Sequence, residues 1–444
     1  MMNQNSLQYA ATPQSPASQP LDATYRKIAY RLLPILFLSY VVSYLDRQNI
    51  GFAKLQMQQE LNFSDSVFGL GASIFFLGYI LFEVPSNILL HKLGARRWIA
   101  RIMISWGLIS ALMFVTRGPV SFYVLRLLLG VAEAGLVPGA ILYLSQWFPA
   151  SRRARVVAIF YSAVAVSGIV GGPVSGWLMQ TFNGAYGLSG WQWLFISEGL
   201  PSMLMGLIVW RFMVDSPDHA GWLSPEERMA VKAELAVVAH ASGSEMRALA
   251  DPQLWLLIVV FFMLCAGITG VGLWMPTLVQ ATGVRSLTQI GLLTAVPYLV
   301  AIVAMFFNCR HSDRTGERRW HVALPMLIAA MGLALAVRFE HDTVISLVGL
   351  TLCASGILCS TPPFWSLPVA RLSGRAAAVG VAMVTAMGNL GSFASPYFIG
   401  LTRDLTHSTA IGIYSIAAGL FFGGLLILAY HRHDAVHVFR DVVA

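Results

Sequence analysis

Long apolar runs occupy most of this chain and constrain its fold more than any other feature. A helix of about 20 predominantly apolar residues is long enough to cross the hydrocarbon core of a bilayer. Twelve such runs are found, at 29–50, 66–90, 98–116, 121–148, 155–180, 192–213, 252–279, 288–309, 320–339, 343–369, 375–401 and 408–430. The sequence therefore predicts an all-α integral membrane protein with 12 transmembrane helices.

Composition supports a membrane protein and argues against other classes. The chain is 57% hydrophobic and only 11% charged, whereas a soluble globular chain carries about 25% charged residues. The net charge of +8 would suit nucleic acid, but the basic residues form short clusters between apolar runs. We therefore expect a lipid bilayer and no nucleic acid as partner. The four cysteines form no CxxC pair and no metal cluster is apparent, so no metal or other cofactor is expected.

One long polar stretch, 214–251, separates six apolar runs from six. The predicted organisation is a disordered cytoplasmic tail (1–25), an N-terminal six-helix bundle (26–213), a cytoplasmic linker (214–251), a C-terminal six-helix bundle (252–431) and a second cytoplasmic tail (432–444). Within the linker, Ser224 followed by Pro225 and two glutamates predicts the start of a short amphipathic helix on the membrane surface.

The distribution of basic residues predicts the orientation of the chain. If both termini are cytoplasmic, 22 of the 29 Lys and Arg residues face the cytoplasm. Cytoplasmic loops carry an excess of Lys and Arg, so both termini are expected inside, in the inner (plasma) membrane. The outside loops would hold five basic residues: Lys54, Arg117, Arg285, Arg338 and Arg403.

An internal repeat supports the division into two halves. The loop after the second run reads HKLGARRW (91–98), and the loop after the eighth reads DRTGERRW (313–320). Gly, Arg, Arg and Trp recur in the same order at a constant separation of 222 residues, half the chain. This recurrence indicates a duplication and predicts two pseudo-symmetric bundles.

These features resemble the major facilitator superfamily, and within it the branch of anion:cation symporters. The second loop, Asp313 to Arg319, is similar to the family pattern, whereas the first has His91 in place of the usual acidic residue and Asn87 in place of a glycine. Residues that carry the resemblance to the branch are Tyr44-Leu45-Asp46-Arg47, Asn49-Ile50-Gly51, Glu83-Val84-Pro85-Ser86-Asn87, Arg126, Glu133-Ala134-Gly135 and Gly388-Asn389-Leu390-Gly391. The resemblance implies proton-coupled transport of organic anions by a monomer.

Ionisable side chains within the apolar runs are the candidate functional residues. Each costs about 2.5–3.5 kcal/mol at the centre of a bilayer on insertion scales, so each needs a cavity or a partner. Six stand out, all in the first half: Asp46, Arg47, Glu83, Arg126, Glu133 and Glu198. The second half holds neutral polar residues at comparable depth. We therefore expect the first half to carry charge and protons and the second to shape the pocket, with no role assigned to Glu198.

Four of these residues suggest a mechanism. Arg126 and Glu133 lie two helical turns apart on one face, and they could pair with Asp46 and Arg47, respectively, on the first helix. When all four are ionised their charges sum to zero. Protonation of Asp46 and Glu133 would free both arginines to bind a carboxylate through charge-assisted hydrogen bonds. This predicts Asp46 and Glu133 as proton-coupling residues and Arg47 and Arg126 as substrate-binding residues; fixed ion pairs that lock two helices are the structural alternative.

The resemblance also implies further site residues. Tyrosines at positions 44 and 79 contact substrate in the branch, and the seventh, tenth and eleventh helices line the cavity in this fold. The expected substrate-binding residues are thus also Tyr44, Tyr79, Trp274, Trp365 and Asn389, with interhelical packing as the alternative for each. The expected gating residues are Glu83, Arg96, Arg97, Asp313, Arg314 and Arg318.

The substrate and the alternatives follow from a few further positions. Val164 stands where sugar-acid members carry a glutamine, which favours a small carboxylate, such as a tartrate-like or aromatic acid. The stretch GIVGGPVSG (168–176) partly resembles the motif of drug/proton antiporters, which is the alternative function. No nucleophile or metal set of a membrane enzyme is apparent, and the tails are too short for the output domain of a receptor, so we expect a transporter that is not an enzyme.

Overall fold

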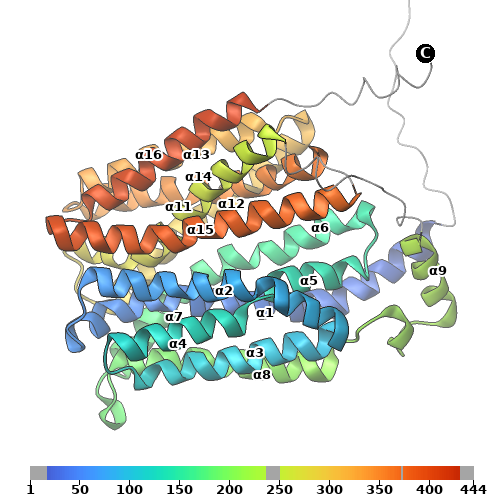
Figure 1. The fold of residues 1–444 in the computed structure, drawn as a ribbon, viewed down its shortest axis with the longest axis horizontal. Helices are drawn as coiled ribbons and strands as arrows, with labels where there is room; N and C mark the ends of the chain where they lie inside the picture. The colour runs from blue at the N-terminus through green and yellow to red at the C-terminus, as the bar shows by residue number, and fades with distance from the viewer. Residues whose placement is uncertain (1–17, 237–250, 372–373, 431–444) are drawn as a thin grey trace, which may run out of the picture.

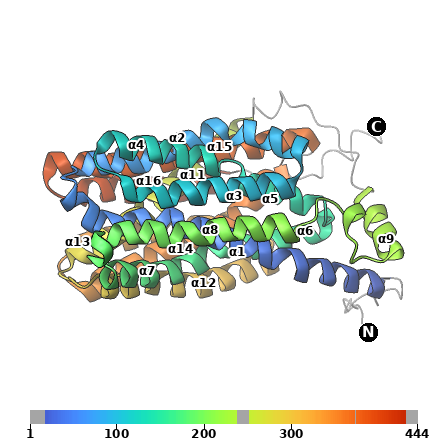
Figure 2. The ribbon, with the colours of Figure 1, turned by 90° about the horizontal axis from the view of Figure 1, so that it is seen from below.

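The computed structural model describes residues 18–236, 251–371 and 374–430, and within these ranges the chain forms helices and no strand. Residues 1–17 and 431–444 of the predicted tails, and 237–250 of the predicted linker, lie outside the described residues. Two groups of roughly parallel helices pack against each other. They lie one above the other in Figure 1, and in the view from below in Figure 2 the first half lies in front of the second. Eleven helical segments in the described part of the chain are long and apolar enough to cross a membrane.

The first half contains eight helices. They are α1 (Ser18–Glu60), α2 (Asp65–Leu93), α3 (Ala95–Leu112), α4 (Pro119–Glu133), α5 (Leu136–Ser145), α6 (Ala150–Tyr161), α7 (Ala163–Thr181) and α8 (Gly190–Phe212). Two predicted runs are therefore each divided, 121–148 into α4 and α5 and 155–180 into α6 and α7. The first division lies at Gly135, whose φ of 90° suits glycine. The break frees the carbonyl of Ala134, which accepts a hydrogen bond of 2.6 Å from Ser86 of α2.

Helix α1 is longer than the sequence predicts at both ends. It begins at Ser18, so residues 18–25, which were expected in a disordered tail, are helical. It ends at Glu60, so Lys54 lies inside this helix and not in an outside loop. The side chain of Lys54 is 2% exposed. The apolar pattern ends too early here because Lys54 and the glutamine residues that follow it are polar yet remain helical.

The linker contains a short helix, α9 (Pro225–Ala236), at the expected position. Ser224 caps it by accepting a hydrogen bond from the backbone amide of Glu227, whose carboxylate accepts one from the amide of Ser224. Lys27 of α1 donates to the same carboxylate at 2.8 Å. This hydrogen bond lowers the pKa of Glu227, so the contact between α1 and α9 persists at neutral pH and is lost as the pH falls through that lowered pKa.

The second half repeats the packing of the first. Its helices are α11 (Pro252–Ala281), α12 (Leu287–Thr315), α13 (Arg319–Arg338), α14 (Thr343–Arg371), α15 (Gly374–Thr406), which spans the predicted run 375–401, and α16 (Ala410–Leu426). Helix α12 packs on α14 as α2 packs on α4, and α13 packs on α16 as α3 packs on α8. The repeated loops also agree, because Gly94 and Gly316 both adopt positive φ, 88° and 68°. At these positions the chain turns between two helices with a backbone that favours glycine.

The two halves meet most closely near the end of α1 and the start of α2. Helix α2 packs along α15, α7 along α12, and α1 against α11. Glycines allow backbones to touch: a Cβ on Gly69 would lie 2.4 Å from the carbonyl oxygen of Pro396, and one on Gly51 would lie 2.5 Å from that of Leu273. Hydrogen bonds also cross the interface there, from the amide of Tyr397 to Ser73 for example. We call this region the closed end.

Replacing Gly69 with alanine should weaken the closed end, because the added Cβ cannot fit against the Pro396 carbonyl without displacing one half. A cysteine introduced at the buried position 73, in a background without the four native cysteines, should then react several-fold faster with a membrane-impermeant thiol reagent. Gly118→Ala is the matched control, since a Cβ there meets no atom within 4 Å. Equal reaction rates in the two variants would contradict this account of the interface.

Candidate functional site

An ion pair between Arg47 of α1 and Glu133 of α4 lies at the centre of the first half. Arg47 Nε donates to Glu133 Oε1 at 2.7 Å, and Ser43 Oγ donates to the same oxygen at 2.7 Å. The Glu133 side chain is 1% exposed, but that of Arg47 keeps 19% of its surface exposed. Two atoms of the pair, Arg47 Nη2 and Glu133 Oε2, have no hydrogen-bond partner. The pair thus retains one free donor and one free acceptor.

Aromatic and acidic side chains surround this pair. The Arg47 guanidinium lies 5.1 Å from the ring centroid of Tyr79, whose α2 helix also carries Glu83 one turn further on. Tyr161 of α6 lies near Arg47, Glu83 and Cys265 of α11. The group therefore faces the second half of the protein. We call Ser43, Tyr44, Arg47, Tyr79, Glu83, Glu133 and Tyr161 the central cluster.

Arg126 is buried in α4, two turns before Glu133, and has no carboxylate partner among the described residues. Its Nε and Nη2 donate to the backbone carbonyls of Gly71 and Ala72 in α2, each at 3.2 Å. Its guanidinium also lies 4.9 Å from the ring centroid of Phe75. A buried cation that is bound only by carbonyl dipoles has no counter-charge in direct contact, so Arg126 adds positive charge to an interior that also holds Asp46 and Glu133.

Asp46 does not pair with Arg126, one of the two pairings that the sequence allowed. Its carboxylate points instead between α3 and α8, where Ser110 donates to Oδ1 at 2.7 Å and Ser202 to Oδ2 at 3.2 Å. Asn49 donates to Oδ1 at 3.1 Å. Asp46 and Arg47 are adjacent in sequence, but the helix turns them about 100° apart, so they contact different helices. The other pairing, Arg47 with Glu133, is present.

The three expected pocket residues of the second half lie in different surroundings. Trp274 of α11 is fully buried at the closed end, with Lys54 Nζ 4.2 Å from its ring centroid. Trp365 of α14 is partly exposed and packs edge-on against Phe261 at 4.7 Å. Asn389 of α15 makes no hydrogen bond to a described residue. Trp274 is therefore positioned to help close the interface, whereas Trp365 and Asn389 retain accessible surface.

A charge network at the closed end was missed by sequence reasoning. Lys54 pairs with Asp65 at 2.8 Å, and Asp65 pairs with Arg403 of α15 at 3.0 Å. Asp404 accepts hydrogen bonds from the amides of Asp65 and Ser66 at the start of α2. These contacts join α1, α2 and α15 across the two halves. The available signal was that apolar residues resume beyond Lys54, at Leu55 and Met57, which suits a helix that continues past the lysine.

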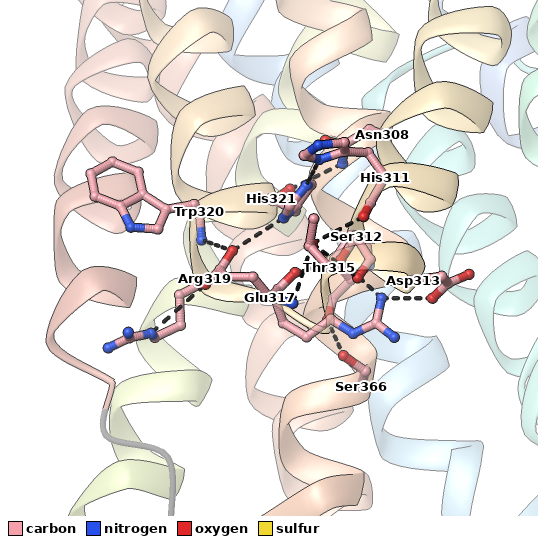
Figure 3. A network of polar contacts seen from close by, with 12 residues as sticks. Asn308, His311, Ser312, Asp313, Thr315, Glu317, Arg319, Trp320, His321 and Ser366 are labelled. Atoms are coloured by element: carbon pink, nitrogen blue, oxygen red, sulfur yellow. Dashed lines mark hydrogen bonds and ion pairs between the residues drawn. The ribbon is translucent and has the colours of Figure 1, made fainter. Parts of the chain in front are cut away.

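Of the expected gating residues, Glu83 lies in the central cluster on α2, and the other five lie at the opposite end from the closed end, within the repeated loops. In the second loop, Arg318 pairs with Asp313 at 2.7 Å and donates to Ser312 at 2.8 Å (Figure 3). Arg314 and Asp313 line an open cleft of about 400 Å³ with Phe306, Cys309 and Arg310. These contacts stay within the second half.

In the first loop, the linker supplies the acidic residue that the sequence lacks at His91. The backbone amide of Arg96 donates to Asp215 Oδ1 at 2.8 Å, and Arg97 is exposed. Trp98 Nε1 donates to Ser86 at 2.9 Å, and Ser86 donates to Ala134 at the α4–α5 break. The loop is thus connected through Ser86 to the helix that carries Glu133. Asp215 lies in the linker, too far along the chain for a loop motif to reveal it.

The fold and the buried charges together define a polytopic membrane transporter with two similar helical bundles. Residues 36–396 match the model of the Major Facilitator Superfamily. The chain belongs to this superfamily and is a transporter rather than an enzyme.

Named relatives agree with this assignment. A protein of Agrobacterium vitis that is named for tartrate transport is 48% identical over 92% of this chain and 91% of its own length. A metabolite transport protein of Pseudomonas putida, NicT, is 39% identical over 95% of this chain and 97% of its own length. A quinolone resistance transporter of Acinetobacter baumannii is 38% identical over 91% of this chain and 94% of its own length. The chain is therefore similar to transporters of organic compounds.

Solved structures show the same fold. A bacterial homologue of the lysosomal transporter Spinster, in an inward-facing conformation, aligns with a TM-score of 0.71 over 93% of this chain and 99% of its own, at 18% identity. The inward-open xylose transporter XylE of Escherichia coli aligns with a TM-score of 0.74 over 91% of this chain and 96% of its own, at 14% identity. At such identities the likeness concerns the fold alone.

The Lys54–Asp65 pair should contribute to stability, because both side chains are largely removed from water. In a double-mutant cycle with Lys54→Gln and Asp65→Asn, we expect a coupling energy of about 1–3 kcal/mol, measured by unfolding of the purified protein. The exposed pair of Lys232 and Asp218 in the linker is the control and should give less than about 1 kcal/mol. Equal coupling in the two cycles would contradict a structural role for the buried pair.

Proposed function

We propose that this protein imports a small organic anion together with protons, by alternating access. The observation that carries the proposal is the Arg47–Glu133 pair with its free donor and free acceptor. A substrate carboxylate could bind Arg47 Nη2, and a proton could bind Glu133 Oε2. Each event weakens the hold of Glu133 on Arg47 and so favours the other. Binding of the anion and of the proton would thus be coupled at one ion pair.

Charge balance explains why such coupling is needed. Two acids, Asp46 and Glu133, and two bases, Arg47 and Arg126, sum to zero when all four are ionised, and Glu83 can only add negative charge. An anion that entered this site would leave net negative charge in a low-dielectric interior, which is unfavourable. Protons on the two acids would compensate that charge. Arg126, which lacks a carboxylate partner, would attract the anion towards the cluster.

The direction of opening follows from the proposed orientation. With both termini cytoplasmic, the closed end would face outwards, and the central cluster would be reached from the cytoplasm. The network of Lys54, Asp65 and Arg403 would then be an outer gate, and the loops around Arg96, Arg97, Arg314 and Arg318 would act as inner gate in the opposite state. Trp274 would belong to the outer gate, which differs from its expected role in the pocket wall.

The substrate class is proposed from the lining and from the named relatives. Tyr44, Tyr79 and Tyr161 offer hydroxyl groups beside Arg47, while Val164 one turn beyond Tyr161 adds an apolar wall. Trp365 and Asn389 would complete the pocket from the second half. A compact carboxylate with few hydroxyl groups suits this lining, and relatives named for tartrate transport support the same class.

Uptake into proteoliposomes tests the proposal directly. An inward-directed pH gradient should drive accumulation of one or more acids from a panel of tartrate-like, aromatic and sugar carboxylates, and a protonophore should abolish it. Asp46→Asn should lose accumulation but retain exchange of substrate across the membrane. Absence of gradient-driven uptake for every carboxylate tested would refute the proposed function.

Glu133→Gln should uncouple anion binding from pH. The neutral amide no longer holds Arg47, so the variant should bind anion at pH 8 roughly tenfold to hundredfold more tightly than the parent does. Its binding should also depend less on pH than that of the parent, which should bind more weakly as the pH rises. The remaining pH dependence would come from Asp46. Titration calorimetry at several pH values measures both effects, with Glu60→Gln at the end of α1 as control. A parental pH dependence in Glu133→Gln would exclude this residue as the coupling acid.

Drug efflux is the second candidate function, because one named relative is a quinolone resistance transporter. Antiport of a cationic or neutral drug favours an acid-dominated cavity, whereas the central cluster offers a free guanidinium donor on Arg47 beside its acids. The two functions are distinguished by expression in a drug-sensitive host. Resistance to quinolones without carboxylate uptake would favour efflux.

A further inference from the structure

A second buried carboxyl group lies close to Asp46, outside the central cluster. Glu198 of α8 is 6% exposed, and its Oε1 accepts a hydrogen bond of 2.8 Å from Ser175 of α7. Ser202, one turn further along α8, donates to Asp46. Asn49, which donates to Asp46, lies beside the Glu198 carboxyl group. Asp46, Asn49 and Glu198 thus form one polar group enclosed by α1, α3, α7 and α8.

At its Glu198 end, this group has two acceptors that lack a donor. Glu198 Oε2 and Asn49 Oδ1 are both buried acceptors without a partner. A proton on the Glu198 carboxyl group would supply a donor to this pair of acceptors. An unpaired acceptor in the interior is unfavourable, so the site favours a carboxyl group that carries a proton.

None of the basic side chains of α3, α7 and α8 reaches this group. Arg126 of α4 interacts electrostatically with Asp46 but forms an ion pair with neither carboxyl group. Helix α7 has no charged residue, and Arg96, Arg97 and Arg101 of α3 lie in its first two turns, far from Ser110. Arg211 of α8 lies in the last turn of that helix. The charged neighbour of Glu198 is Asp46 on α1, next to Arg47, which is bound to Glu133. Two carboxylates so placed repel each other, so they favour sharing at least one proton.

We propose that Glu198 is a second proton-coupling residue, which binds and releases a proton during transport as a pair with Asp46. The Asp46–Glu198 pair would store protons apart from the anion, while Glu133 exchanges its proton beside Arg47. Because Asp46 and Arg47 are consecutive on α1, movement of Arg47 on anion binding would also displace Asp46 from Ser110 and Ser202. This inference rests on the proposed proton symport and extends it by one carboxyl group.

The test is the limiting accumulation ratio of the anion in proteoliposomes, with the membrane potential held at zero. Under a pH difference of one unit, each coupled proton contributes a factor of ten to this ratio. Glu198→Gln keeps the size of the side chain and a donor but cannot exchange a proton, so its ratio should fall roughly tenfold. Glu198→Asp keeps a carboxyl group and should retain a higher ratio than Glu198→Gln. Glu60→Gln serves as the control, and exchange of anion without a gradient reports whether each variant is folded.

The outcomes separate the inference from the proposed function. If the parent accumulates no carboxylate under the gradient, the proposed symport fails. If the parent accumulates but Glu198→Gln reaches the same ratio, only the role of Glu198 fails. A purely structural Glu198 would tolerate the isosteric glutamine better than the shorter aspartate. The inference would therefore also be overturned if Glu198→Asp reached a lower accumulation ratio than Glu198→Gln, or if Glu198→Asp alone lost exchange. Loss of exchange in both variants would likewise assign Glu198 to packing.

Discussion

The ion pair of Arg47 and Glu133 is the interaction on which the arrangement of the first half depends. Removal of one partner from a buried pair costs about 3–5 kcal/mol, because the remaining charge has no water to compensate it. The pair therefore ties α1 to α4 whenever both groups are charged. It is also incomplete, since one donor and one acceptor are free. In the proposed symport, a substrate anion or a proton would complete it, so an arrangement that is stable when empty would respond to both.

Helix α1 connects the regions of the molecule that transport would have to coordinate. Along this helix Asp46 contacts α3 and α8, Arg47 contacts α4, and Lys54 contacts α2 at the closed end. The spacing of these residues, rather than any loop, sets the distance between the central cluster and the closed end. A small rotation of α1 would therefore alter all these contacts at once, which gives a physical route from proton binding to opening of the interface.

The sequence predicts the class of fold and the position of most charges, but not their partners. The apolar runs and the repeated loops locate the helices because length and hydropathy are local properties. Arg47 and Glu133 were paired correctly, whereas Asp46 turned to serines of α3 and α8 that no charge pattern reveals. Lys54 was assigned to a loop because a lysine ends an apolar run, although its partner Asp65 and the ring of Trp274 allow it to be buried. Such partners come from distant segments and depend on how the helices pack.

The three buried acids Asp46, Glu133 and Glu198 differ in the groups that bind them, and the sequence alone did not reveal those groups. Glu133 is paired with Arg47, so a proton that binds Glu133 competes with Arg47 for the carboxylate. A bound anion would compete with Glu133 for Arg47 in turn. Asp46 and Glu198 are held by hydroxyl and amide groups, which can serve both the charged and the neutral form of a carboxyl group. In the proposed symport, the first environment would link a proton to the anion, and the second would hold a proton largely independently of the anion. The first half could then bind protons at two separate places. A proton on Glu133 would balance the charge of the anion, and a proton on the Asp46–Glu198 pair would add to the driving force.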